Sequence, residues 1–201
     1  MDCRFNRVHN FYVCLETERD VIANISAGTL SGLLDYVSSF NLNELRLQKL
    51  NESTLGFQKI VAEREFSAQH LEITNFSGGV AFLTRHLRSG TLSSLQAYNF
   101  DKDELTDDLE AFVCRPTFKE LRCNFECFNV ENFKRIIDYW KLSENLQACE
   151  IVETTSRNLY DQFASWITPT DTEDGPYFFE EIGDLMLSVE CKDRYCSLMI
   201  E

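Results

Sequence analysis

Short apolar phrases recur along the chain at nearly regular intervals. Each phrase has an apolar residue, two variable residues, a second apolar residue, a polar residue and a third apolar residue. The central residues follow one another at steps of 26, 24, 26 and 28 residues. Self-similarity at this period is typical of stacked-repeat proteins, and it lies in or near the leucine-rich-repeat range. The copies are Leu42-x-x-Leu45-x-Leu47, Ala68-x-x-Leu71-x-Ile73, Leu92-x-x-Leu95-x-Ala97, Phe118-x-x-Leu121-x-Cys123 and Leu146-x-x-Cys149-x-Ile151, with a fainter first copy at Val8-x-x-Phe11-x-Val13.

Each phrase predicts a short strand followed by an amphipathic helix. Alternate residues of a strand face opposite sides, so Leu45 and Leu47 point inward while Arg46 points outward. Apolar residues at helical spacing follow each phrase and predict helices over residues 55–65, 80–88, 104–114, 130–141 and 157–167. Parallel strands joined by helical crossovers result.

The two ends of the chain differ from the repeats. Residues 8–15 and 21–26 predict an N-terminal β-hairpin, followed by a helix near residues 30–40. Alternating apolar residues in 185–189 and 196–200 predict a C-terminal hairpin. The loop over residues 168–177, with two prolines and a glycine, is the clearest break in the chain.

We therefore predict one α/β leucine-rich-repeat-like solenoid with hairpin caps at both ends. Residues 1–40 form the first cap, 41–167 the strand–helix repeats, and 168–201 the loop and second cap. Such caps are needed because an open solenoid end exposes core. The residues expected to be buried are Leu45, Leu47, Leu71, Ile73, Leu95, Leu121, Ile151 and Trp140.

The formal net charge of −14 over 201 residues argues against nonspecific binding to nucleic acid or to an acidic membrane surface. It favours either a basic partner or an extensively solvated surface. The N-terminal ten residues contain no apolar signal region, and no apolar run reaches the ~18 residues of a membrane span. Together with free cysteines at core positions, this predicts a reducing compartment, the cytoplasm or the nucleus.

The sequence contains no strong catalytic motif, and we predict a protein that is not an enzyme and has no cofactor. The Cys123-x-x-x-Cys127 pair invites a zinc interpretation, but no second ligand pair lies at zinc-finger distance. We expect no metal site. A less favoured alternative is a thiol-dependent enzyme that uses one of the eight cysteines with one of the three histidines.

Two acidic clusters also need an interpretation. The first, between Asp101 and Glu110, lies at the start of a predicted helix, where acids complement the helix dipole, and it lacks the ligand spacing of an EF-hand. The second lies between Asp171 and Asp184 and is expected to be solvated.

The outward-facing strand positions are the best candidates for a binding site. In stacked repeats these positions align on one sheet face, and Tyr and Arg are enriched at binding hot spots. The same row can be an ordinary solvated sheet, and the helix side or the turns are alternative contact surfaces. The predicted partner-binding residues are Arg46, His70, Glu72, Gln96, Tyr98, Arg122 and Glu150.

The segment FKELRCNFECFNVENFKRIIDYWKLSENLQACEIVET resembles the nematode F-box-associated homology domains. The helix ending in Ile136-Ile137 and Trp140, the following turn, and the strand Leu146-x-x-Cys149-x-Ile151 carry the resemblance. The closing segment LMLSVECKDRYCSLMIE and the opening FNRVHNFYVCLETERDVIANIS are also similar to parts of that family.

The resemblance implies the substrate-recognition region of a Skp–cullin–F-box ubiquitin ligase. An F-box normally opens with a Leu-Pro dipeptide, whereas the prolines here are Pro116, Pro169 and Pro176. The resemblance therefore supports recognition of a protein partner and leaves recruitment of Skp and cullin open. The alternative is an F-box-less decoy or inhibitory protein, which binds the usual target without delivering it for ubiquitination.

Overall fold

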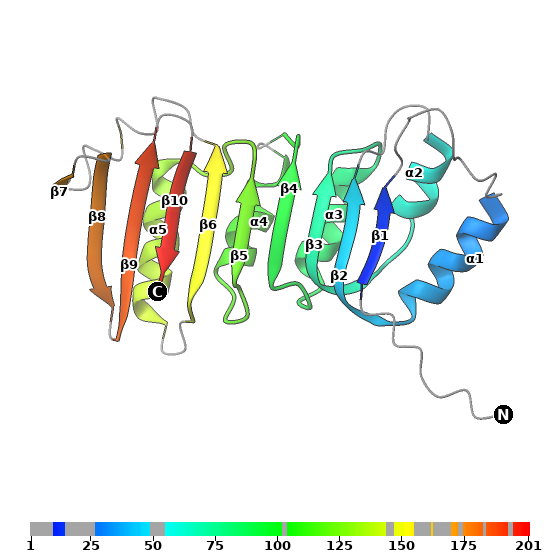
Figure 1. Ribbon diagram of the computed structural model, residues 1–201, viewed down its shortest axis with the longest axis horizontal. Coiled ribbons are helices and arrows are strands. Elements are labelled where there is room, and N and C mark those ends of the chain that lie inside the picture. Colours follow the sequence, from blue (N-terminus) through cyan, green and yellow to red (C-terminus); the bar gives the residue numbers. More distant parts are fainter. Residues whose placement is uncertain are drawn as a thin grey trace. The chain divides into compact units, whose positions relative to one another are not determined.

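The computed structural model shows a mixed α/β protein in which strands and helices alternate over most of the chain (Figure 1). It divides into two compact units, Met1–Leu92 and Ser93–Glu201. The hydrophobic spacing did not predict this division. The residues that the structure describes are 10–14, 27–48, 55–101, 104–143, 147–154, 162, 170–172, 175–182, 184–192 and 195–201.

Unit 1 has three parallel strands in the order β1-β2-β3, with helices packed on one side of them (Figure 1). The strand phrases appear as β2 and β3, whose register pairs Leu45 with Leu71 and Leu47 with Ile73. All four of these side chains are fully buried. The elements are β1 (Asn10–Cys14), α1 (Ala27–Ser38), β2 (Asn41–Gln48), α2 (Leu55–Ala62), β3 (Ser67–Thr74) and α3 (Gly79–Arg88).

Unit 2 continues the same alternation and then changes to an antiparallel sheet. Its strand order is β4-β5-β6-β10-β9-β8-β7, with β4, β5 and β6 parallel and the remaining pairs antiparallel. The elements are β4 (Ser94–Tyr98), α4 (Thr106–Val113), β5 (Glu120–Cys123), α5 (Val130–Leu142), β6 (Cys149–Thr154), β7 (Thr170–Thr172), β8 (Gly175–Ile182), β9 (Leu185–Lys192) and β10 (Tyr195–Ile200).

Helix α5 shows how local sequence and packing agree in unit 2. Asn129 and Asn132 form a reciprocal capping box, which satisfies backbone N–H groups at the start of the helix. At the other end, the buried indole of Trp140 donates to the carbonyl of Val113 at 3.0 Å. The helix is thereby tied to α4, and its apolar stripe faces the core.

The expected core residues are confirmed, because every one of the eight named above is buried. The helices expected over 55–65, 80–88, 104–114 and 130–141 are also confirmed, with ends shifted by a few residues. The helix expected near 30–40 starts earlier, at Ala27. The one expected over 157–167 lies outside the described residues, apart from Gln162.

The terminal predictions had mixed outcomes. The C-terminal hairpin is confirmed as β9 and β10, which pair in antiparallel fashion. The loop assignment for 168–177 was wrong, because β7 and the start of β8 form a hairpin there. At the N-terminus, β1 pairs in parallel with β2, as a repeat strand does, and the expected second hairpin strand over 21–26 lies outside the described residues.

The mixed α/β class is therefore established, but these features do not establish a leucine-rich-repeat solenoid. Parallel strands with helical crossovers are common to several α/β architectures. The antiparallel strands of unit 2 depart from a uniform strand–helix repeat.

The acidic segment before α4 follows the helix-dipole interpretation. Asp107 and Asp108 lie in the first turn of α4, where acids interact favourably with the helix N-terminus. Glu110, one turn later, pairs with Arg135 of α5 through two contacts of 2.7 Å. Of the second acidic cluster, the side chains of Glu181 and Asp184 are described, and both are exposed.

Candidate functional site

The candidate site is the sheet face that the described helices leave open in each unit. Strand alternation creates it, because the apolar residues of β2 point to the helices and the intervening Glu44, Arg46 and Gln48 point away. On β3, His70 and Glu72 occupy the matching positions, directly opposite Glu44 and Arg46. We call the polar side chains of β1, β2 and β3 on this side the unit 1 face.

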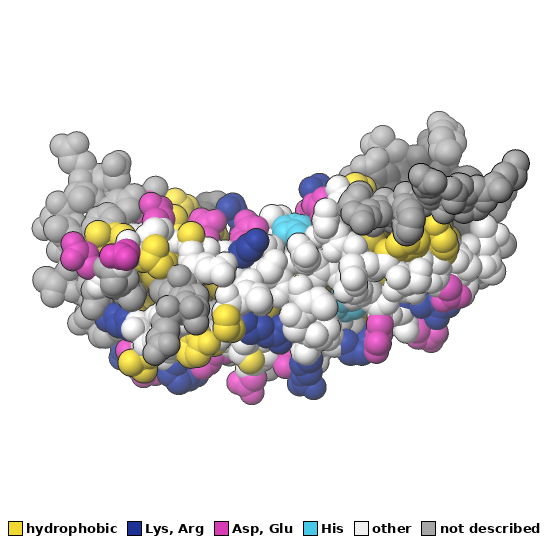
Figure 2. Space-filling view, turned by 90° about the horizontal axis from the view of Figure 1, so that it is seen from below, with side chains coloured by type: hydrophobic (Ala, Val, Ile, Leu, Met, Phe, Trp, Pro, Cys, Tyr) yellow, Lys and Arg dark blue, Asp and Glu magenta, His cyan; other side chains and the backbone are white. Residues whose placement is uncertain are grey.

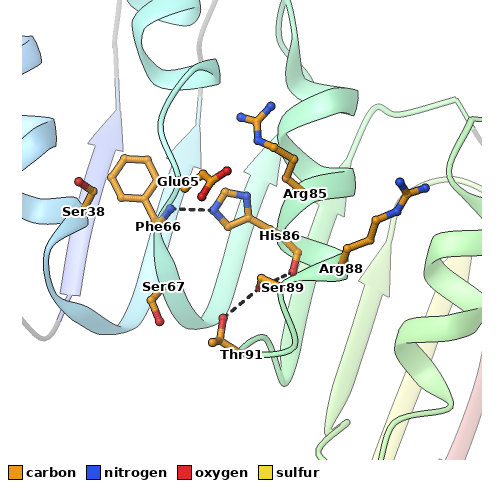
Figure 3. A pocket seen from close by; sticks show the side chains of 9 residues that line it. All are labelled: Ser38, Glu65, Phe66, Ser67, Arg85, His86, Arg88, Ser89 and Thr91. Atoms are coloured by element: carbon orange, nitrogen blue, oxygen red, sulfur yellow. Dashed lines mark hydrogen bonds between the residues drawn. The ribbon is translucent and has the colours of Figure 1, made fainter.

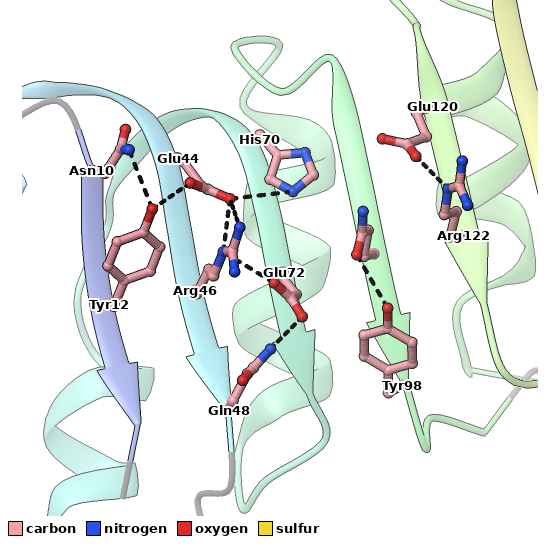
Figure 4. Close-up of polar contacts among 11 residues, drawn as sticks. Asn10, Tyr12, Glu44, Arg46, Gln48, His70, Glu72, Tyr98, Glu120 and Arg122 are labelled. Carbon is pink, nitrogen blue, oxygen red and sulfur yellow. Dashed lines mark hydrogen bonds and ion pairs between the residues drawn. The ribbon is translucent and has the colours of Figure 1, made fainter.

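Glu44 is the centre of the unit 1 face (Figure 4). Its Oε2 accepts a hydrogen bond from the Tyr12 hydroxyl at 2.6 Å, and its Oε1 accepts one from Arg46 Nε at 2.7 Å. Arg46 Nε also lies 3.1 Å from Glu72 Oε2, and His70 Nε2 lies 3.9 Å from Glu44 Oε1. Gln48 closes the group by donating to Glu72. One arginine is therefore held between two carboxylates.

The contacts within this group shift the pKa values of its members. Partial burial works to raise the pKa of Glu44, but the Tyr12 hydrogen bond and Arg46 outweigh it and hold that pKa below 4.5. The hydrogen bond to Glu44 raises the pKa of both the Arg46 guanidinium and the Tyr12 phenol. Arg46 also lies 5.0 Å from the centre of the Tyr12 ring, within cation–π range.

A second group has the same construction in unit 2. Arg122 on β5 is hydrogen-bonded to Glu120 on its own strand, and its Nη2 lies 2.8 Å from Glu150 Oε2 on β6. Beside it on β4, the Tyr98 hydroxyl donates to Gln96 Oε1 at 3.1 Å. We call these side chains the Arg122 group.

The predicted partner-binding residues thus fall into two groups. The structure brings Arg46, His70 and Glu72 together in unit 1, and it joins Arg122 to Glu150 and Gln96 to Tyr98 in unit 2. The predicted residues, however, omit the carboxylates that orient both arginines, Glu44 and Glu120, and also Tyr12. The repeated tripeptide Glu-Leu-Arg, at 44–46 and again at 120–122, was the available signal.

Unit 1 also contains a cavity of about 560 Å³ (Figure 3). It is lined by Phe66 and His86 together with Arg85, Arg88 and several hydroxyl groups. His86 connects two parts of the backbone through its ring nitrogens. His86 Nδ1 lies 2.8 Å from the carbonyl of Phe82, and Nε2 accepts a hydrogen bond from the backbone N–H of Phe66 at 3.3 Å.

These bonds assign the proton of His86 to Nδ1 and leave neither ring nitrogen open to a substrate. Burial lowers the pKa of His86 below 6.5, which favours the neutral ring. The ring also stacks on Phe82 with centroids 4.0 Å apart. The geometry therefore gives His86 a packing role and does not leave its ring available as a general base.

Three of the described cysteines do not have the surroundings of reactive thiols. Burial raises the pKa of Cys114 to about 11 and that of Cys149 to about 12. It also raises the pKa of Cys127 well above 9.0. Thiolates, which are the nucleophilic form, are thereby disfavoured at these three positions. Within the described part of the chain, no group of three or more His, Cys, Asp or Glu side chains is arranged to hold a metal ion.

A buried carboxyl lies on the helix-covered side of unit 2. Glu153, at the end of β6, is fully buried, and its Oε2 accepts hydrogen bonds from the backbone N–H groups of Cys127 and Phe128 at 2.9 and 3.2 Å. Its Oε1 has no hydrogen-bond partner among the described residues. Burial raises the pKa of Glu153 well above 4.5, so the protonated acid is favoured.

The charge pattern on the face drawn in Figure 2 does not single out a class of partner. In the view of Figure 2, acidic and basic side chains lie interspersed. None of the described helices has the length and apolar character needed to cross a membrane.

Comparison with known proteins leaves the site to be interpreted from its own geometry. No family model, curated protein or solved structure matches this chain. The resemblance to the nematode F-box-associated homology domains therefore stays a prediction from the sequence.

Proposed function

We propose that this chain is a non-catalytic protein-binding module and that its partner contacts the open sheet face. The observation that carries the proposal is the repeated acid–arginine–acid arrangement on that face, at Glu44–Arg46–Glu72 and at Glu120–Arg122–Glu150. Arg46 and Arg122 are the most exposed members, with side-chain exposures of 46% and 47%.

This arrangement suits recognition of a protein for a physical reason. Side chains that are already held in one geometry lose little conformational entropy when a partner binds. Charged groups in a fixed pattern select partners by complementarity and disfavour partners with like charges. Tyr98 and Arg122 are, in addition, the residue types that most often act as hot spots.

We further propose that the strand–helix units are repeats of a leucine-rich-repeat-like array, and that the chain acts as a substrate-recognition region like that of a ubiquitin-ligase F-box protein. The recurring apolar phrase and the sequence resemblance support both points. An F-box-less decoy has the same binding face, so the two roles differ in the machinery that co-purifies. The raised cysteine pKa values favour either role over a thiol-dependent enzyme.

Affinity purification with mass spectrometry tests the proposal. The bait is the full chain, compared with the double variant Tyr98→Ala/Arg122→Ala. A matched control carries Glu131→Ala and Asp138→Ala on the exposed side of α5. We expect a specific partner to be retained by the wild type and the control and to be depleted from the face variant.

The co-purifying machinery separates the two roles. Skp and cullin subunits in the eluate indicate a ligase subunit, whereas their absence beside a retained partner indicates a decoy. A partner that the face variant retains while the α5 control loses it would move the interface to the helix side. Each face substitution is expected to weaken the purified complex by about 1 kcal/mol or more.

A further inference from the structure

Beyond Arg122, the open face of unit 2 changes from polar to partly apolar. On β6, β10 and β9, the residues Ile151, Leu198 and Leu187 point into the core and are fully buried. Val152 and Met199, on the alternate positions of β6 and β10, are partly exposed. Met186 on β9 is 37% exposed. The register places these apolar side chains on the face that carries the Arg122 group.

The apolar side chains adjoin that group directly. Met199 lies opposite Glu150 on β6 and opposite Ser188 on β9. Glu150, in turn, holds Arg122. Met186 is one step further along the same face, since its backbone exchanges hydrogen bonds with Glu201 at 2.8 and 3.0 Å. We call Val152, Met186 and Met199 the methionine patch.

The border of the methionine patch is acidic. Glu181 lies opposite Met186 on β8, and Glu201, directly after β10, pairs with Met186 from the other side, so both lie on the same face and both are exposed. Together with Glu120 and Glu150, they give four carboxylates beside the guanidinium of Arg122 among the described side chains of this region. The excess of negative charge favours a partner with positive charge and disfavours an acidic one.

The methionine side chains at the centre of the patch indicate that the partner also contributes apolar side chains. Methionine is flexible and polarisable, so it adapts to different apolar side chains at binding surfaces. An apolar centre inside a polar border is also the usual anatomy of a protein interface. The unit 1 face differs, because the Tyr12 ring lies against its arginine and the strands β1, β2 and β3 contain no methionine.

We propose that the methionine patch binds a segment of a partner protein in which apolar side chains are flanked by lysine or arginine. The apolar side chains would bury Met186, Met199 and Val152, and the cations would pair with Glu150 and Glu181. This inference rests on the proposed function and specifies where the partner binds and what its chemistry is.

A displayed library of random short peptides, selected against the folded full chain, tests this directly. We expect the enriched peptides to combine an excess of Lys and Arg with an excess of large apolar residues. Their affinity for the Met186→Ser/Met199→Ser variant should fall by about tenfold or more, since a few buried side chains at the centre of an interface carry most of the binding energy. Their affinity should also fall with rising salt concentration.

Two further variants keep the result interpretable. Glu150→Gln preserves shape while removing one charge, and it should weaken the enriched peptides about threefold or more through lost electrostatic attraction. The control Tyr12→Ser/Arg46→Ser alters the unit 1 face and should leave affinity unchanged. Circular dichroism verifies that each variant is folded.

The alternative outcomes distinguish failure of this inference from failure of the proposed function. Enrichment of acidic peptides, or of peptides whose affinity survives both the methionine and the Glu150 changes, overturns the inference. If affinity is lost only in the unit 1 control, the inference fails while the proposed function stands. If no enriched peptide depends on either face, both fail.

Discussion

Glu44 on the open face of unit 1 and Glu153 inside unit 2 show two ways in which the fold accommodates a carboxyl group. Glu44 keeps some solvent contact, at 17% side-chain exposure, and has Arg46 as its counter-charge. Glu153 is fully buried and accepts from two backbone N–H donors, and none of the described Lys, Arg or His side chains forms an ion pair with it. The first is held as the anion and the second as the neutral acid.

The difference lies in what each carboxyl can do. A paired anion at the surface contributes to recognition, because its charge remains visible to a partner. A neutral buried acid contributes instead to the position of a loop. Through Cys127 and Phe128, Glu153 fixes the segment that leads into the Asn129 cap of α5. One residue type thus serves the proposed binding face in unit 1 and the position of a loop in unit 2.

The largest expected effect separates these roles by mutation. Glu153→Ala leaves two buried N–H groups unpaired and opens a cavity, so we expect the free energy of unfolding to fall by about 2 to 4 kcal/mol at pH 5. Urea denaturation measures this free energy of unfolding. Glu150→Ala, on the exposed face of the same strand, is the control, with an expected change of about 0 to 1 kcal/mol. Equal losses in the two variants would contradict a special role for Glu153.

The pH dependence of stability gives a second, smaller effect. Because the pKa of Glu153 is raised in the folded chain, its contribution is complete below 4.5 and is lost as the pH rises toward its folded pKa. Glu153→Gln keeps a carbonyl for the two N–H donors and removes the ionisation. We expect this variant to lose less stability than the wild type between pH 5 and neutral pH.

Thermal unfolding in a series of buffers from pH 5 to neutral pH measures the slope of stability against pH. Glu150→Gln is the matched control and should keep the wild-type slope. A Glu153→Gln variant that follows the wild type across the whole range would mean that Glu153 ionises normally in the folded protein.

The contrast also shows how far the sequence determines the fold and where it falls short. Period-two alternation and the recurring phrase were sufficient to find the strands, because each buries its central residue completely, as Leu71 and Leu121 do. The same alternation, continued from Cys149 and Ile151, points Glu153 inward. The burial of Glu153 was not predicted, because an acid is expected to face water.

Two other features depend on contacts that a linear pattern does not contain. The strands β7 and β8 were missed because Pro169, Gly175 and Pro176 are typical of a loop, although a strand can begin at such residues. The partners of Arg46 were only partly found. Glu72 lies on a different strand, and Tyr12 is 32 residues from Glu44. Which carboxylate an arginine meets on a neighbouring strand is decided by sheet register, not by spacing along the chain.

The smallest effect is expected at Tyr12, and it tests whether the Glu44 carboxyl is held as an anion by specific bonds. Tyr12→Phe keeps the ring over Arg46 and removes only the hydroxyl that donates to Glu44 at 2.6 Å. That hydrogen bond lowers the pKa of Glu44, so its loss should raise this pKa while the fold is unchanged.

The side-chain carboxyl signal of Glu44, followed by NMR from neutral to acidic pH, measures the shift in Tyr12→Phe. Because a lowered carboxyl pKa stabilises the fold above the unfolded value and loses that contribution as the pH falls, the variant should also be slightly less stable near neutral pH. Glu150 provides the internal control, since its contact with Arg122 does not involve Tyr12. A Glu44 titration that does not move would leave Arg46 as the group that keeps this carboxyl charged, and would reduce Tyr12 to a cover for the arginine.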